Sequence, residues 1–172
     1  MRKVGNVLLY SPSDLVTFVE SDFVSWMDRL YLEFPDRVVP DVPEGIVVTI
    51  RAQGIQHEAD YLSSLVAKGA AVTDLSENKN NLEPTLLAMH RGDPVIYQAY
   101  LSYGDFAGYA DFLVRVPGDS RLGQWHYEVH DTKIAREPKP YHLIQLCCYA
   151  EMLESIQGRR PKQVAVVLGN TN

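Results

Sequence analysis

The chain is poor in cysteine, because only Cys147 and Cys148 occur among its 172 residues. Neighbouring helical positions point in different directions, so reduced core thiols are expected rather than a disulfide or a shared metal site. No apolar run is long enough to span a bilayer, and the N-terminus lacks the apolar core and cleavage site of a secretory signal. A cytoplasmic protein without a membrane segment is therefore expected.

The sequence also lacks an excess of basic residues over acidic ones. The formal net charge is -6, which argues against a surface built for non-specific DNA binding. The charge is uneven, because acids dominate from Asp14 to Glu44 while bases outnumber acids from Lys133 to Lys162. A local phosphate-facing surface is therefore still compatible with the second of these segments. The length fits a single domain over 1–172, and a hydrophobic fraction of 46% excludes a disordered chain.

Helical spacing dominates the first half of the chain. After an extended segment and the start Ser11-Pro12-Ser13, one helix is predicted to run to Phe34-Pro35. Its apolar residues would pack as one broad face: Leu15, Phe18, Val19, Phe23, Trp26, Met27 and Leu30. A proline-rich loop is predicted over 35–45 and a second helix from about Ile55 to a stop at Gly69. A strand over 70–75 and a short helix over 83–90 follow.

From Val95 the pattern becomes extended. Three β-branched and aromatic segments joined by short turn signals predict an antiparallel meander, with strands at 95–103, 106–116 and 125–134. A helix is predicted from about Tyr141 to Ile156, ended by Gly158, and then a central strand buried on both faces at 164–169. The order predicts a layered α/β domain. The final Leu-Gly-Asn-Thr-Asn fits either a compact unit or the N-terminal fragment of a longer protein.

Three polar signatures interrupt these apolar segments, and they are Asp111, the triplet Asp131-Thr132-Lys133, and Gln145 with Tyr149. A carboxylate inside an apolar strand carries a desolvation cost that a metal or an ion pair can offset. Alternation along the strand places Asp131 and Lys133 on one face, and Asp111 on the neighbouring strand can point there too. Two carboxylates and a main-chain carbonyl such as that of Thr132 suit Mg²⁺ or Mn²⁺.

The helix after these strands adds Gln145 and Tyr149. Their i, i+4 spacing puts both on one face, where an amide and a phenol can position a water, Lys133 or a phosphate. The alternative is that Gln145 faces solvent and Tyr149 belongs to the core.

These motifs together resemble the PD-(D/E)xK nuclease superfamily, and in particular its RecB-like branch. The resemblance rests on Gly108-Tyr-Ala-Asp111-Phe112, on the strand that ends in Asp131-Thr132-Lys133, and on the helix with Gln145 and Tyr149. Modules of this family found alone or joined to helicase domains have a similar Ser-Pro-Ser-Asp-Leu start, a Gly-x-x-His-Glu helix, here with His57 and Glu58, and a Tyr-Glu-Val-x-Asp-Thr-Lys strand.

The resemblance implies a restriction-endonuclease-like core, in which a mixed central β-sheet is flanked by α-helices. It implies metal ligation by Asp111 and Asp131 with either His57 or Glu58, Lys133 as the catalytic lysine, and Gln145 with Tyr149 as the helix motif. The implied activity is Mg²⁺- or Mn²⁺-dependent hydrolysis of DNA, in single strands or at ends, in DNA repair or recombination, with a helicase domain or subunit as a partner.

Four alternatives accompany this interpretation. Some RecB-like nucleases hold an iron–sulfur cluster with four cysteines, which Cys147 and Cys148 cannot supply, so no cluster is expected. A zinc site at His126 and His130 is disfavoured, because both share the face opposite Asp131. The acidic composition also fits a catalytically weak nucleic-acid-binding or regulatory module of a helicase–nuclease system. Finally, Asp111, Asp131 and Lys133 could form a purely structural salt-bridge cluster.

Overall fold

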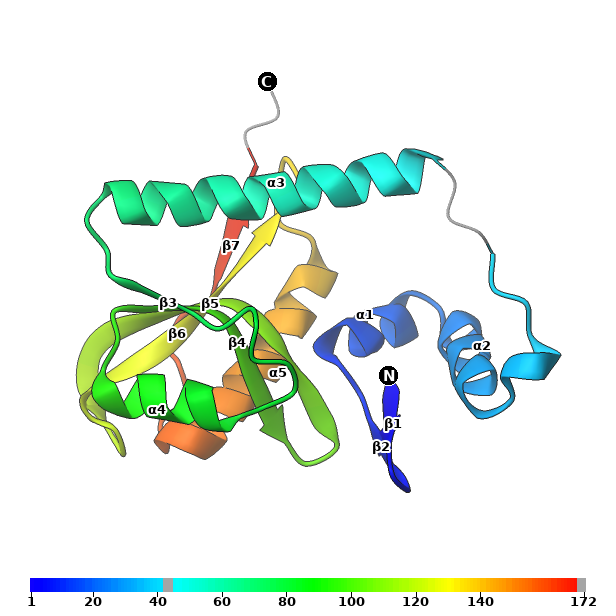
Figure 1. The fold of residues 1–172 in the computed structure, drawn as a ribbon, viewed down its shortest axis with the longest axis horizontal. Helices are drawn as coiled ribbons and strands as arrows, with labels where there is room; N and C mark the ends of the chain where they lie inside the picture. The colour runs from blue at the N-terminus through cyan, green and yellow to red at the C-terminus, as the bar shows by residue number, and fades with distance from the viewer. Residues whose placement is uncertain (42–44, 170–172) are drawn as a thin grey trace.

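One mixed β-sheet forms the centre of the molecule. The computed structural model describes residues 1–41 and 45–169. In the described part, five strands lie in the order β3-β4-β5-β6-β7 with helices around them (Figure 1), which confirms a mixed α/β fold. The strands are β3 (Val72–Asp74), β4 (Val95–Tyr103), β5 (Phe106–Ser120), β6 (Gly123–Lys133) and β7 (Ala165–Leu168).

The predicted meander is confirmed. Strands β4, β5 and β6 pair antiparallel in sequence order, and the outer strands β3 and β7 each pair parallel with their neighbour. The prediction of a central last strand is wrong, because β7 lies at the edge of the sheet beside β6 and its residues are half-buried. An uninterrupted apolar run indicates that both faces of a strand are covered. It does not indicate whether the strand has one neighbouring strand in the sheet or two.

Helix α5 (Pro140–Gln157) supplies the main cover of the sheet. Its buried Leu146, Met152 and Leu153 share one core with Leu101 and Val129 of the sheet. The helix ends at Gly158 in a left-handed conformation, as predicted. The predicted helix before Gly92 is likewise confirmed as α4 (Glu83–Arg91), which contacts β4.

The predicted single helix over 15–34 is two helices, α1 (Pro12–Glu20) and α2 (Asp22–Glu33). Ser21 between them is extended, with φ -161° and ψ 107°, and its side chain accepts from the Val24 N–H to cap α2. The hydroxyl offers the backbone a bond that competes with a continuous helix. The expected broad apolar face is also wrong, since Phe18, Phe23 and Trp26 are all more than half exposed.

Helix α3 (Gly45–Ala67) begins well before the predicted Ile55. Apolar residues such as Ile46 and Val48 are exposed in its first turns, so no amphipathic pattern marks the start. In the predicted loop over 35–45, a 3-10 turn, η1 (Pro35–Arg37), is seen, and residues 42–44 lie outside the described residues. Figure 1 shows α3 lying across the ends of β6 and β7.

The N-terminal hairpin β1 (Arg2–Val4) and β2 (Val7–Leu9) contains the predicted extended segment. It leads through Tyr10, which bridges to Phe106 of β5, into α1. At the other end, residues 170–172 of the final Leu-Gly-Asn-Thr-Asn lie outside the described residues. Across 1–41 and 45–169, no helix is both long and apolar enough to cross a membrane.

Candidate metal and catalytic site

Asp131 is a buried carboxylate near the end of β6. Its side chain is 1% exposed, and Oδ2 lies 2.6 Å from Nζ of Lys133, so the two side chains share a face as predicted. The contact lacks the angles of a hydrogen bond, and no other described group donates to this oxygen. Burial and then the charge of Asp111 raise the pKa of Asp131 and Lys133 lowers it, which together leave this pKa at about 6. This oxygen is therefore held by the ion pair with Lys133 and accepts from no other described group.

Asp111 lies on β5, across from this oxygen. The pairs Leu113↔Val129 and Phe112↔His130, continued by one position, set Asp111 opposite Asp131. Its Oδ2 accepts from the Thr132 N–H at 2.9 Å and from the Thr132 hydroxyl at 3.0 Å. Thr132 therefore orients one carboxylate with its donors. Its carbonyl is on the same short segment, and the predicted ligand role of that carbonyl stays a prediction.

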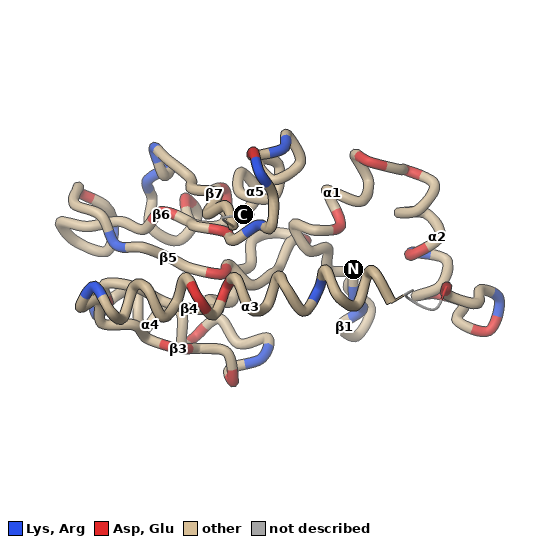
Figure 2. Tube along the Cα trace, turned by 90° about the horizontal axis from the view of Figure 1, so that it is seen from above, with Lys and Arg blue, Asp and Glu red and all other residues tan. Residues whose placement is uncertain are grey.

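Glu58 brings a third carboxylate from α3. Its carboxylate accepts from Nε2 of Gln98, in β4. Burial raises the pKa of Glu58, the charge of Asp111 raises it further, and the positive charge of Lys133 opposes these shifts. Figure 2 shows acidic positions of α3 beside β4 and β5. The helix and the meander thus meet at this group of charges.

Gln98, whose side chain donates to Glu58, has an uncommon backbone conformation. Its φ is 53°, inside a β-strand, and the regular pairing of β4 with β5 skips it between Tyr97↔Phe112 and Ala99↔Ala110. A non-glycine residue with positive φ costs of the order of 1–3 kcal/mol, so the surrounding structure must enforce it. Sequence reasoning missed Gln98. The available signal was an amide that interrupts an apolar strand, as Asp111 does.

His57 points away from the carboxylates. Its Nε2 lies 3.0 Å from the carbonyl oxygen of Val167, in β7. A cavity on that side is lined by Gln53, Asp60 and Ile134 among others. Consecutive helical positions are about 100° apart, so His57 and Glu58 cannot both face the same group. Of the two residues that the sequence left open, Glu58 is the one whose carboxylate is affected by the charge of Asp111.

Helix α5 contributes its two predicted side chains differently. Gln145 is half-buried, with Nε2 3.4 Å from Oδ1 of Asp131, and so it is not solvent-facing. Tyr149 is a core residue, and its hydroxyl donates to the Tyr109 carbonyl at 2.5 Å. Burial, followed by the charges of Asp111 and Asp131, raises the pKa of Tyr149, which therefore stays a neutral donor.

Gly108 allows this helix to approach the sheet. A Cβ at Gly108 would lie 2.9 Å from the Tyr149 hydroxyl oxygen and 2.7 Å from Cδ of Pro12. Steric crowding thus explains the glycine of the Gly-x-Ala-Asp-Phe motif. Without a side chain at Gly108, Tyr149 and the start of α1 can contact the strand that carries Asp111.

The histidines of β6 are separate from this site. The Tyr61 hydroxyl of α3 lies 3.2 Å from Nδ1 of His130, and Nε2 of His126 lies 3.9 Å from Glu128. Burial lowers the pKa of both imidazoles. Within residues 1–41 and 45–169, no three His, Cys, Asp or Glu side chains are already arranged as a metal cage.

Two carboxylates suffice for Mg²⁺, which keeps several waters and takes one or two protein carboxylates in addition to substrate phosphate. The pair of carboxylates of Asp111 and Asp131, with Lys133 as the one described partner of Asp131 Oδ2, fits such an ion. Comparison of the chain with family models, with curated proteins and with solved structures gives no match.

Proposed function

We propose that the chain is a Mg²⁺- or Mn²⁺-dependent nuclease that hydrolyses DNA phosphodiester bonds, with the RecB-like core of the PD-(D/E)xK superfamily. One observation carries the proposal: Asp131 is buried opposite Asp111, and its Oδ2 forms an ion pair of 2.6 Å with the ammonium group of Lys133. A structural ion pair alone gives no reason to add a second carboxylate to a buried one, since like charges raise the cost of burial.

Asp111 and Asp131 would hold the ion, with Glu58 as the nearest further carboxylate and the carbonyl of Thr132 as a candidate ligand. When bound, a divalent ion lowers the pKa of a coordinated water and neutralises charge on the reacting phosphate. Thr132 fixes the orientation of Asp111 through two donors, and Gln145 approaches the other oxygen of Asp131. The site residues thereby hold one another in place before substrate arrives.

Lys133 is the candidate catalytic lysine. Its side chain is 26% exposed while that of Asp131 is 1% exposed, so the ammonium group lies at the boundary between the buried carboxylate and solvent. There it can orient an attacking water or stabilise the charge that develops on phosphate. Tyr149, kept neutral and bound to the backbone of β5, positions the strand that carries Asp111.

The proposed substrate is DNA, as single strands or ends, in repair or recombination, with a helicase domain or subunit as partner. The test is cleavage of end-labelled single-stranded and duplex DNA with Mg²⁺, Mn²⁺ or EDTA. Cleavage is expected with either metal and is expected to be lost in Asp131→Ala and Lys133→Ala. Circular dichroism must show that both variants are folded.

The same experiment separates the alternatives. If the wild-type chain binds DNA and cleaves neither DNA nor RNA with either metal, the enzyme proposal fails and a nucleic-acid-binding module remains. If Asp111→Asn lowers stability without changing Mn²⁺ affinity, the carboxylates are a structural salt-bridge cluster and the site model fails.

A further inference from the structure

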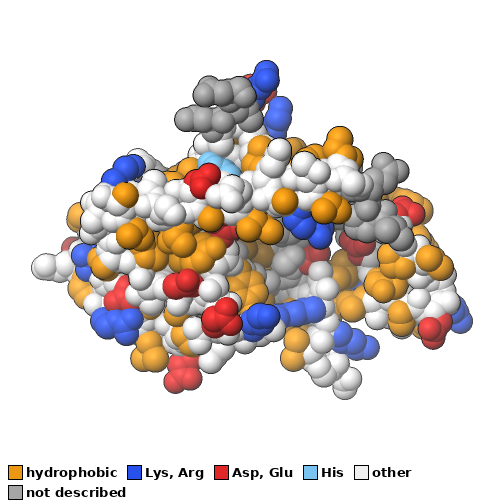
Figure 3. Space-filling model, turned by 45° about the horizontal axis from the view of Figure 1, so that its top comes forward, with side chains coloured by type: hydrophobic (Ala, Val, Ile, Leu, Met, Phe, Trp, Pro, Cys, Tyr) orange, Lys and Arg blue, Asp and Glu red, His pale blue; other side chains and the backbone are white. Residues whose placement is uncertain are grey.

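A second cavity, of about 400 Å³, opens beside the candidate site. Three of its lining residues, Asp111, Gln145 and Tyr149, belong to that site. The rest come from the N-terminal hairpin, the start of α1 and strands β4 and β5, and they include Arg2, Ser13, Tyr100 and Tyr109. Figure 3 shows the molecular surface hollowed beneath α3. The cavity therefore connects the acidic site with elements that the proposed chemistry does not use.

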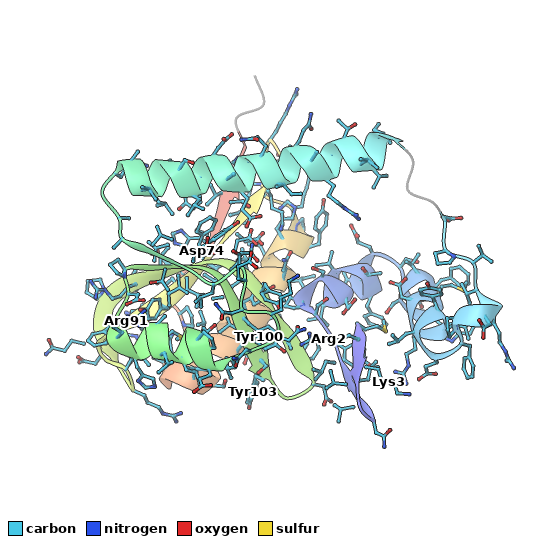
Figure 4. The ribbon with its side chains drawn as sticks, viewed as in Figure 1. Arg2, Lys3, Asp74, Arg91, Tyr100 and Tyr103 are labelled. Atoms are coloured by element: carbon cyan, nitrogen blue, oxygen red, sulfur yellow. The ribbon has the colours of Figure 1, made fainter. Side chains whose placement is uncertain are left out.

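The wall formed by Arg2, Tyr100 and Tyr109 is aromatic and basic. The guanidinium carbon of Arg2 lies 5.4 Å from the centroid of the Tyr100 ring, and its Nη2 donates to the Tyr100 hydroxyl (Figure 4). The Tyr100 and Tyr109 rings follow at 5.2 Å between centroids. Cation–π contact and the hydrogen bond together fix the position of this guanidinium.

The positive charge of Arg2 is not neutralised by a carboxylate. No Asp or Glu in the described residues forms an ion pair with Arg2, and the nearby carboxylate of Asp14 is used by the N–H and hydroxyl of Ser11 in the cap of α1. In a chain of net charge -6, a fixed guanidinium that has no ion-pair partner among the described residues and lines the same cavity as Asp111 calls for an explanation. An anionic ligand supplies one, because guanidinium groups bind phosphate oxygens in a planar, two-pronged geometry.

The size of the cavity limits the ligand. Cavities that hold drug-sized molecules range from about 300 to 1,000 Å³, so one of about 400 Å³ is of a size to hold a single nucleotide. Aromatic rings beside a cation are the usual surface for a single nucleic-acid strand, since every base and sugar has an apolar face to contact.

We propose that this cavity binds one nucleotide of a single-stranded substrate, next to the phosphate that meets Asp111 and Asp131. Arg2 contacts the neighbouring phosphate and the half-buried Tyr109 contacts the sugar and base, while the buried Tyr100 ring, 6% exposed, holds Arg2 and Tyr109 in place. The inference rests on the proposed nuclease function for its choice of ligand. It narrows the proposed substrate from single strands or ends to a single strand, and it names the residues that would contact that strand.

The test is equilibrium binding of fluorescein-labelled dT12 to the full chain in EDTA, followed by fluorescence anisotropy at several salt concentrations. Arg2→Ala is expected to raise the Kd about 5- to 10-fold at low salt, and to reduce the slope of log K against log salt by about 0.7, the value for one lost phosphate contact in a single strand. Arg2→Lys is expected to restore the slope. Tyr100→Phe, which keeps the ring and releases Arg2, is expected to raise the Kd by a smaller factor.

Arg37→Ala is the matched control. Arg37 also lies over an aromatic ring, 5.1 Å from the centroid of Phe34, but outside the cavity. Equal Kd and slope for Arg2→Ala and Arg37→Ala would overturn the inference even if the wild-type chain cleaves DNA, and so would preferred binding of duplex. Binding that depends on Arg2 without any cleavage would support the inference and refute the proposed function alone.

Discussion

The ammonium group of Lys133 lies 2.6 Å from the buried Oδ2 of Asp131, two residues earlier on the same strand. Lys133 lowers the pKa of Asp131, while burial and Asp111 raise it. The balance between these effects leaves the pKa at about 6, so Asp131 is ionised at neutral pH only by a modest margin.

Lys133→Met is expected to raise the pKa of Asp131 above about 6, because the positive charge that lowers it is lost. Carbon-detected NMR of the Asp131 carboxyl measures the shift. Cleavage is expected to fall by ~10²-fold or more, the usual loss for a residue that acts in proton transfer or charge stabilisation. Lys139→Met is the control, since Lys139 forms an exposed ion pair with Glu137 at 3.2 Å. Equal activity of the two variants would exclude Lys133 as the catalytic lysine.

Stability is expected to depend on the ionisation of Asp131. Its pKa is 3.8 in an ordinary setting and about 6 in the folded chain. Between these values the folded chain retains a proton that the unfolded chain has released, so the free energy of unfolding falls as pH rises from 3.8 to about 6. Asp131→Asn removes this loss of unfolding free energy, because an asparagine side chain does not ionise. Urea titration at pH 7.5 without metal is expected to show the variant more stable by ~1–3 kcal/mol, with no difference near pH 4.

Added Mn²⁺ is expected to stabilise the wild-type chain more than it stabilises Asp131→Asn. Mn²⁺ at 100 times its Kd is expected to stabilise the wild-type chain by about 2.7 kcal/mol and Asp131→Asn by much less. Asp36→Asn, at an exposed position of η1, should behave like wild type in both titrations. A wild-type chain that gains no stability from Mn²⁺ would contradict the metal site.

Glu58 and His57 are expected to differ in their effect on metal binding. Glu58→Gln removes a carboxylate that lies with Asp111, whereas His57→Ala removes an imidazole bound to the Val167 carbonyl. Electron paramagnetic resonance of Mn²⁺ should show affinity reduced ~10-fold in Glu58→Gln, a typical loss for a supporting group. Affinity in His57→Ala should be unchanged, and a larger loss there would reassign the ligand.

Gln98→Gly and Gln98→Ala together separate backbone strain from hydrogen bonding. Both variants lose the bond to Glu58, but only glycine adopts φ 53° without steric cost. Gln98→Gly is expected to be more stable than Gln98→Ala by ~1 kcal/mol in urea denaturation. Mn²⁺ affinity should fall equally in both. Equal stabilities would mean that the strand relaxes locally and stores no strain.

Gly108→Ala should disturb the contact between α5, α1 and the sheet. A Cβ there meets Pro12 at 2.7 Å and Tyr149 at 2.9 Å, so a loss of ~1–3 kcal/mol of unfolding free energy is expected. Gly54→Ala, inside α3 with no neighbouring atom within 4 Å, is the opposite control and should gain ~0.5–1 kcal/mol. A neutral Gly108→Ala variant would show that α5 shifts without cost.

The meander and α5 could be predicted because each repeats a clear local pattern. Period-two alternation identified β4 to β6, and Gly158 marked the end of α5. Once Leu113 and Val129 pair, Asp111 and Asp131 have to meet. These are properties of one strand, one turn or one helix end, which the sequence encodes over short distances.

Other features depend on partners distant in sequence. The choice between His57 and Glu58 requires the rotation of α3 relative to the sheet, which no local pattern records. The edge position of β7 follows from strand order, and an apolar run looks the same in either place. The break at Ser21 is local, but serine is common inside apolar helical segments, so its capping role appears only once the two helices separate.

The crossing of α3 over the strand ends gives the site a particular assembly order. Asp111 and Asp131 lie on neighbouring strands joined by a single turn, whereas the rest of α3, strand β3, helix α4, strand β4 and the start of β5 separate Glu58 from Asp111. The sheet can therefore present its two negative charges before α3 docks, and docking adds a third against electrostatic repulsion. A divalent cation would remove that repulsion. Binding of the proposed ion and docking of α3 onto the sheet would therefore favour each other.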